Sequence, residues 1–160
     1  MSSISIRPAT ESDQAWVDET LIREWAGPLV ERGDEFVDVT KLPAQIAETD
    51  GGRVGLMTLL VHADHLEIFT LNSFREGQGI GSALMNAAER EAVKQNLTEI
   101  RLFVVNHNLR ALGFYQRRGY RIWAAHRDSI TRARLVKPAI PLVSSDGIPI
   151  CDELELRKTL

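Results

Sequence analysis

The sequence has only one cysteine and no long apolar run, and each shortage excludes a class of protein. Cys151 cannot form a disulfide within the chain, which excludes a disulfide-stabilised scaffold and favours a reducing compartment. No run is long enough to span a bilayer, and the first ten residues, MSSISIRPAT, lack the apolar core of a signal peptide. We therefore expect a cytoplasmic protein with no membrane partner.

The chain also has no excess of positive charge. It carries 19 lysine and arginine residues against 22 aspartate and glutamate residues, which gives a formal net charge of −3. Nucleic-acid binding usually needs a broad basic surface, so we expect no nucleic-acid partner. Histidine, aspartate and glutamate are scattered along the chain rather than grouped at the spacing of metal ligands, so we also expect no metal.

The length and composition are those of one globular domain, which we expect to extend over residues 1–160. A content of 44% hydrophobic and 26% charged residues is enough for a single core. Helix patterns are expected from Thr10 to near Gly27, over 80–96, over 108–119 and over 129–137. Strand patterns are expected in the segments SISIRPA, KLPAQIAETDGG, RVGLMTLLVH, HLEIFTLN, LTEIRLFVV, YRIWAAH and DELELRKTL.

The order of these patterns predicts the fold class. RVGLMTLLVH and HLEIFTLN are joined at Ala63-Asp64, which predicts an antiparallel hairpin, and a strand–helix–strand unit follows in the middle of the chain. Residues 27–40 are expected to be irregular, and the proline-rich segment KPAIPLVSSDGIPI is expected to be a loop or an edge ribbon. We therefore expect a mixed α/β fold.

One short stretch, FREGQGIGSAL, has three glycines at alternate positions immediately before a helix pattern: Gly77, Gly79 and Gly81. Backbone N–H groups at the start of a helix have no intrahelical partners and lie at the positive end of the helix dipole. Glycine lets a ligand approach that backbone and permits a positive φ. The stretch therefore predicts a phosphate-binding turn. The alternative is a tight turn that only allows close packing of helix on sheet.

Two common phosphate-binding motifs fit this stretch poorly. A P-loop needs a lysine after its last glycine, and none follows here. A dinucleotide fingerprint needs a glycine at its sixth position, where this chain has Ser82 or Leu84, depending on the glycine from which the count starts. A nucleotide-dependent oxidoreductase is thus poorly supported.

A third motif fits better and carries a family resemblance. Its pattern is Val or Ile, four residues, Gln or Arg, two residues, Gly, any residue, then Gly or Ala. Leu71, Gly79 and Gly81 occupy three of these places, whereas Glu76 departs from the pattern at the Gln/Arg place and Arg75 lies one position early. A second motif of the same family is matched in NLRALGFYQRRGY by Asn108, Ala111, Tyr115, Gly119 and Tyr120.

Because both motifs occur in order, a helix and a strand apart, the sequence resembles the GCN5-related N-acetyltransferase (GNAT) family from about Leu66 to Trp123. The resemblance implies a mostly antiparallel central sheet with flanking helices, in which strands Leu66–Asn72 and Ile100–Val105 splay apart around the pantetheine of acetyl-CoA. It also implies transfer of the acetyl group to a primary amine of a small molecule or peptide by direct attack. The implied cofactor-binding residues are Phe69, Leu71, Gly77, Gln78, Gly79, Ile80, Gly81, Ser82, Asn108 and Tyr115.

The resemblance also assigns the proton transfers. Tyr115 matches the family's tyrosine, which implies a general acid for the leaving thiolate, although an aromatic at helical spacing could equally belong to the core. We assign Glu67 as the general base, with a solvated strand glutamate as the alternative. Asn108 is expected to cap its helix and also to bind the cofactor. Other candidates for the base are His65, His107 and His126.

The sequence leaves two questions open. The departure at Glu76 keeps a second function possible, that of a non-catalytic acyl-CoA-binding or regulatory module. The segment from about 128 to 152 departs from the short family core, and it could cover the acceptor site or form a contact in a homodimer. No motif identifies the acceptor amine.

Overall fold

The structure is a computed structural model that describes residues 2–160. The chain divides into two compact units, and each is described by itself. The first unit contains residues 2–30, 38–100 and 160, and the second contains residues 31–37 and 101–159. The fold is of the mixed α/β class with mostly antiparallel strands and flanking helices, as the sequence predicted. No helix in residues 2–160 is long and apolar enough to cross a bilayer.

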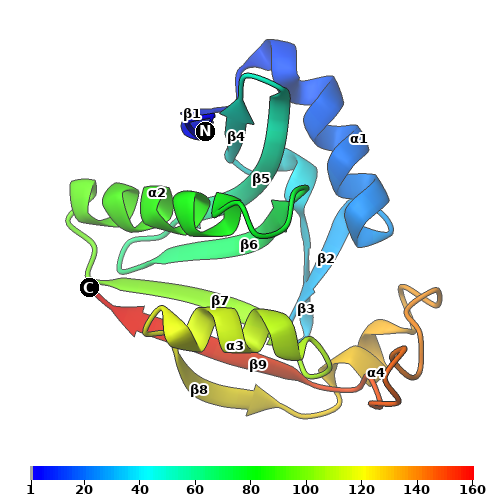
Figure 1. Ribbon diagram of the computed structural model, residues 1–160. Coiled ribbons are helices and arrows are strands. Elements are labelled where there is room, and N and C mark those ends of the chain that lie inside the picture. The colour runs from blue at the N-terminus through cyan, green and yellow to red at the C-terminus, as the bar shows by residue number, and fades with distance from the viewer. Residues whose placement is uncertain (1) are drawn as a thin grey trace. The chain divides into compact units, whose positions relative to one another are not determined.

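Four strands of the first unit follow the order β1-β4-β5-β6, and each neighbouring pair is antiparallel. The predicted hairpin is confirmed by the pairing of β5 with β6. Figure 1 shows α2 running alongside β6, whereas α1 lies apart from α2. The elements of this unit are β1 (Ser5–Pro8), α1 (Gln14–Trp25), β4 (Ala44–Thr49), β5 (Gly52–Val61), β6 (Leu66–Ser73) and α2 (Ile80–Lys94), with 3-10 turns at Glu11–Asp13 and Val39–Lys41.

The helical segment that the sequence predicts from Thr10 begins with the 3-10 turn Glu11–Asp13, which leads directly into α1. The Thr10 side chain and the backbone N–H of Asp13 form one half of a capping box, and the Asp13 carboxylate accepts a hydrogen bond from the Thr10 N–H at 2.8 Å as the other half. The helix ends at Ala26, which is left-handed with φ 56°, and Gly27 follows with φ 128°.

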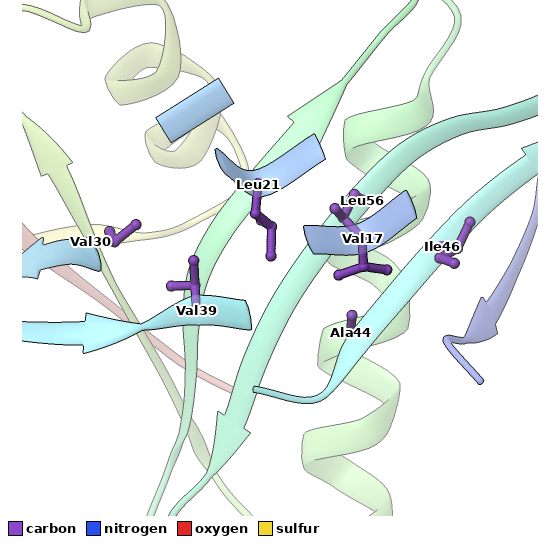
Figure 2. Packing of buried hydrophobic residues seen from close by; sticks show 7 residues of the cluster. All are labelled: Val17, Leu21, Val30, Val39, Ala44, Ile46 and Leu56. Carbon is purple, nitrogen blue, oxygen red and sulfur yellow. The ribbon is translucent and has the colours of Figure 1, made fainter. Parts of the chain in front are cut away.

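The core of the first unit lies between α1 and the strands. Val17 and Leu21 are one helical turn apart, so they share a face of α1 and point toward β4 and β5. Figure 2 shows them beside Ala44 and Ile46 of β4 and Leu56 of β5. The side chains of this cluster are almost completely withdrawn from water. Their burial supplies the main hydrophobic stabilisation of α1 on the sheet.

Gly55 of β5 positions the second helix. Successive residues of a strand face opposite sides of the sheet, so Gly55 faces away from the cluster that contains Leu56. A Cβ at Gly55 would lie 2.6 Å from Ile80 Cγ2 and 3.1 Å from Leu84 Cδ1, both in α2. The absence of a side chain at Gly55 therefore lets the first turns of α2 lie directly against β5.

The second unit contains three neighbouring strands, which follow the order β7-β9-β8. β8 pairs antiparallel with β9, from Arg121 opposite Arg157 to His126 opposite Glu153. A separate two-stranded sheet consists of β2 and β3. The remaining elements are β2 (Leu29–Arg32), β3 (Glu35–Asp38), β7 (Glu99–Val105), α3 (Leu109–Arg117), β8 (Arg121–His126), α4 (Ser129–Ala133) and β9 (Glu153–Thr159).

One prediction for this part of the chain is wrong. The sequence predicts an irregular segment over residues 27–40, but this segment contains β2 and β3, joined by a turn at Gly33 with φ +62°. The strands are only four residues long and their turn is charged, so they show too little alternation for a strand pattern. The proline-rich segment is confirmed as mainly loop, with an isolated bridge between Val143 and Pro149.

Candidate functional site

The glycine turn joins β6 to α2 and lies on the surface of the first unit. Gly77 and Gly79 have φ values of +72° and +77°, which side-chain-bearing residues rarely adopt. A Cβ on either glycine would meet nothing within 4 Å. These two glycines are therefore required by the backbone path rather than by packing, and the space above them is open.

This backbone path presents the start of α2 to that open space. Gly79 is the N-cap and provides no side chain to cap the helix. The first hydrogen bond of the helix is the one that the Ala83 N–H donates to the Gly79 carbonyl at 2.9 Å. The backbone N–H groups of Ile80, Gly81 and Ser82 come before it in the chain, in the first turn, where N–H groups have no partner within the helix. Amides in this position, at the positive end of a 15-residue helix, attract an anion.

A hollow of about 450 Å³ adjoins the turn. Arg75 adds a positive charge to it, and its guanidinium lies over Gly51, where a Cβ would be only 2.9 Å from Arg75 Nη2. Glu76, the next residue, is exposed. The residues that line the hollow are Ser2, Ile4, Thr49, Arg75, Gly77 and Gln78.

The strand that leads to the turn contains a bulge. Thr58 of β5 is opposite Thr70, but the next residue, Leu59, is opposite Ile68, so Phe69 has no Cα partner on β5. The hydroxyls of Thr58 and Thr70 lie 2.6 Å apart and fix the register beside the bulge. A bulge turns one peptide group out of the ladder and redirects it, here in the middle of β6. No residue pattern along the chain indicates this feature.

Glu67 is the second residue of β6, and it is buried rather than solvated. Its exposed fraction is 1%, so the alternative of a solvated strand glutamate is wrong. His65 precedes the strand, and its Nε2 lies 3.9 Å from Glu67 Oε1. Glu67 is therefore held inside the first unit with an imidazole close to its carboxylate.

The structure also corrects the description of metal-ligating residues as scattered. His62, His65 and Glu67 each offer a ligand atom, and these atoms all lie within 4.8 Å of one another. Two residues separate His62 from His65 and one separates His65 from Glu67, so the signal is present in the sequence as H-x-x-H-x-E. The predicted turn at Ala63-Asp64 lies between the two histidines, but a strand pattern does not show that the three side chains meet at the same end of the hairpin.

In the second unit, α3 positions the two remaining predicted residues. Asn108 caps the helix, because its Oδ1 accepts a hydrogen bond from the Ala111 N–H at 3.2 Å. Tyr115 is 8% exposed, and its ring packs edge-on against Tyr120 at a centroid distance of 5.9 Å. Burial raises the pKa of the Tyr115 phenol well above its usual range, so the hydroxyl keeps its proton at neutral pH.

The other histidines have different surroundings. The His126 Nε2 lies 3.3 Å from Glu155 Oε1, within the β8–β9 pair. His107 is half-buried and immediately precedes the Asn108 cap. The structure thus brings one rival base, His65, next to Glu67, and it places the other two in the second unit.

Comparisons with known proteins agree with this geometry. The family model "Acetyltransferase (GNAT) family" matches residues 8–120. The chain is 34% identical over 158 residues to the uncharacterized protein YxbD of Bacillus subtilis (strain 168), and the match covers 98% of this chain and 99% of that protein.

Two solved structures share the fold. A GNAT family acetyltransferase from Elizabethkingia anophelis, crystallised with acetyl-CoA bound, superposes with a TM-score of 0.69 at 18% identity and 98% coverage of both chains. Arabidopsis thaliana Naa50, in complex with the bisubstrate analogue CoA-Ac-MVNAL, gives a TM-score of 0.70 at 20% identity and 99% coverage of both chains.

Proposed function

Because the chain belongs to the acetyltransferase (GNAT) family, we propose that it transfers the acetyl group of acetyl-CoA to a primary amine of a small molecule or peptide. The observation that carries the proposal is the turn at Gly77 and Gly79, where open space lies above left-handed glycines and uncapped helix amides. This arrangement fits the diphosphate of CoA, since it offers N–H donors and a positive dipole end without a side chain in the way.

The proposed cofactor contacts follow from this turn. The amides from Gly77 to Ser82 would hold the diphosphate, and Arg75 adds a positive charge at the adjoining hollow. The backbone of Phe69 and Leu71 on β6 would hydrogen-bond the pantetheine arm. Asn108 and Tyr115 are the contacts proposed from the second unit, by resemblance to the family.

The chain's own groups would then move two protons. When bound, acetyl-CoA supplies a thioester whose carbonyl oxygen gains negative charge under attack and whose thiolate leaves. An amine with a reference pKa of about 10.4 must first lose a proton, and we assign the buried carboxylate of Glu67 to accept it. The backbone at the Phe69 bulge is the proposed oxyanion donor, and the protonated Tyr115 is the proposed general acid.

One assay tests the proposal directly. The protein is mixed with acetyl-CoA and a panel of small-molecule and peptide amines, and the released thiol is measured. We expect amine-dependent release, and binding of acetyl-CoA by calorimetry in the absence of an amine. If no heat of binding is measured, the cofactor assignment is wrong.

A second candidate function is favoured by one observation, the glutamate at position 76. Glu76 occupies the family's Gln/Arg place beside the proposed diphosphate site. A non-catalytic acyl-CoA-binding module would bind acetyl-CoA with measurable heat but release no thiol with any amine. The same two measurements therefore separate the enzyme from the binding module.

A further inference from the structure

A cluster of two histidines and a carboxylate lies at the end of the β5–β6 hairpin in the first unit. His62 directly follows β5, His65 directly precedes β6, and Glu67 is the second residue of β6. The backbone N–H of His62 donates a hydrogen bond to the backbone carbonyl of His65 at 2.8 Å. This bond closes the turn and brings both imidazoles to the same end of the hairpin. We propose that His62, His65 and Glu67 form a binding site for a divalent transition metal of the Zn²⁺ class.

The distances within the cluster suit a metal that draws the ligands together. All three ligand atoms lie within 4.8 Å of one another, and His65 Nε2 is 3.9 Å from Glu67 Oε1. Bonds of about 2.05 Å in a tetrahedral zinc site place the ligand atoms roughly 3.3 Å apart. The ligands therefore need to approach by about 1 Å, which lies within the reach of side-chain rotation.

The imidazoles of His62 and His65 are stacked, so one of the two rings has to move before both can bind one ion. The ring centroids of His62 and His65 are 4.3 Å apart and the ring planes differ by 11°. The nitrogen lone pairs of parallel rings do not converge, so one ring must tilt for both to bind a single ion. His62 is only half-buried and lies beside an exposed turn at Ala63 and Asp64, so it has room to tilt.

Asp64 holds the other histidine in the state that a metal needs. Its Oδ1 lies 2.6 Å from His65 Nδ1, which favours a proton on Nδ1. The lone pair of His65 is then on Nε2, the nitrogen that faces Glu67. A carboxylate that orients a metal-binding histidine through its second nitrogen is a regular part of zinc sites.

The donor set decides the class of metal. Two neutral nitrogens and one carboxylate oxygen suit Zn²⁺ and its neighbours, whereas Ca²⁺ and Mg²⁺ prefer oxygen ligands. Glu67 is 1% exposed and His65 is 6% exposed, so the ion would be held at a largely dry position. The exposed turn at Ala63 and Asp64 provides the entry path and access for water to complete the coordination.

The test measures metal binding directly, because the site shares Glu67 with the proposed chemistry and turnover would confound it. All proteins carry Cys151→Ser, which removes the chain's one thiol as a competing ligand. Metal-free protein is titrated with Zn²⁺ by calorimetry and with Co²⁺ by visible absorption, which reports four-coordinate geometry. We expect one metal ion per chain and Co²⁺ bands stronger than those of the aqueous ion.

The four histidines of the chain provide a matched control. The double variant His62→Ala/His65→Ala should lose at least about 10-fold in Zn²⁺ affinity, whereas His107→Ala/His126→Ala should bind as the parent does. Glu67→Gln keeps the shape of the side chain and removes the anionic ligand, so it should also lose at least about 10-fold, which keeps the test decisive if the double variant fails to fold. Absence of binding by the parent, or equal affinity of Glu67→Gln and the parent, would overturn the site.

Discussion

At the residue scale, Tyr115 combines a buried ring with the proposed role of general acid. The ring is packed against Tyr120, and burial raises the pKa of the phenol, so the hydroxyl remains a proton donor over the physiological range. A buried aromatic at helical spacing is normally only a core residue. The core position and the proposed acid role do not exclude each other, because the buried ring can pack in the core while its hydroxyl keeps a proton.

Replacing Tyr115 with phenylalanine removes the proton donor and keeps the ring. We expect Tyr115→Phe to lower kcat by about 10²-fold or more, the usual contribution of a general acid, while the affinity for acetyl-CoA stays nearly unchanged. Tyr120→Phe is the matched control, since Tyr120 is the chain's other tyrosine and is also buried. Steady-state kinetics and calorimetry measure both effects. Unchanged kcat in Tyr115→Phe would remove Tyr115 from the mechanism.

Glu67 is tested by its pH dependence. If it accepts the proton of the amine, Glu67→Gln should lower kcat/KM by about 10²-fold and remove the limb of the pH–rate profile that rises as the base loses its proton. Glu11→Gln is the control, because Glu11 is an exposed glutamate of the first unit that has no proposed role in the site. A Glu67→Gln profile that retains this limb would clear Glu67 and leave His65 as the next candidate.

At the scale of elements, the proposed cofactor site depends on how closely α2 lies on the sheet. The amides of its first turn are held in place by Ile80 and Leu84, which pack over Gly55 of β5. The position of these backbone amides therefore depends on packing against β5, which lies more than 20 residues earlier in the chain, as well as on the glycine turn.

Gly55→Ala tests this dependence. The added methyl group would lie 2.6 Å from Ile80 Cγ2 and 3.0 Å from the Asn72 carbonyl oxygen, so α2 must shift. We expect a loss of about 1–3 kcal/mol in the free energy of unfolding and a weaker affinity for acetyl-CoA. Gly113→Ala in α3 is the control, because its methyl group would meet only the end of the flexible Arg117 side chain and alanine favours the helix. Denaturant unfolding and calorimetry measure both, and an unchanged Gly55→Ala would contradict this role.

At the scale of the whole molecule, one buried carboxylate makes stability depend on pH. Glu153 begins β9 and is 1% exposed, and its Oε1 accepts a hydrogen bond from the Gly33 N–H in the β2–β3 turn at 3.1 Å. Burial raises the pKa of Glu153 from 4.5 to about 7. The folded state thus holds this proton more tightly than the unfolded state does, so the contribution of Glu153 to stability is fully present below pH 4.5 and is lost as the pH rises through about 7.

Glu153→Gln should remove this loss. Glutamine keeps an oxygen that accepts from Gly33 and carries no charge at any pH, so the variant should gain about 2 kcal/mol relative to the natural chain between pH 5 and pH 8. Urea unfolding at the two pH values measures the difference. Glu155→Gln provides a control in the same strand. A gain of the same size at pH 5 and pH 8 would show that Glu153 does not titrate in this range.

Two expectations about the whole molecule stay predictions. One is a single domain over residues 1–160, and the other is a homodimer, to which the segment from about 128 to 152 could contribute. That segment exposes large apolar side chains, with Leu135 at 87% and Leu142 at 72% exposure. Light scattering of the purified chain measures the oligomeric state.

Features that depend on neighbours along the chain can be predicted from the sequence alone. The helix start near Thr10, the Asn108 cap, the β5–β6 hairpin and the glycine turn are local, and each is predicted from residues a few positions apart. The two family motifs are also local patterns, because one lies within residues 71–81 and the other within residues 108–120. The family resemblance is therefore visible in the sequence alone.

The features that depend on pairing and burial became visible only in the folded structure. The bulge at Phe69 arises from the register between two strands, and the burial of Glu67 arises from packing. The His62–His65–Glu67 cluster arises from the side-chain directions at the end of the predicted hairpin. These contacts depend on which residues lie close together after folding. A strand pattern shows which residues share a face of the strand, but it does not show which residues of other elements pack against that face.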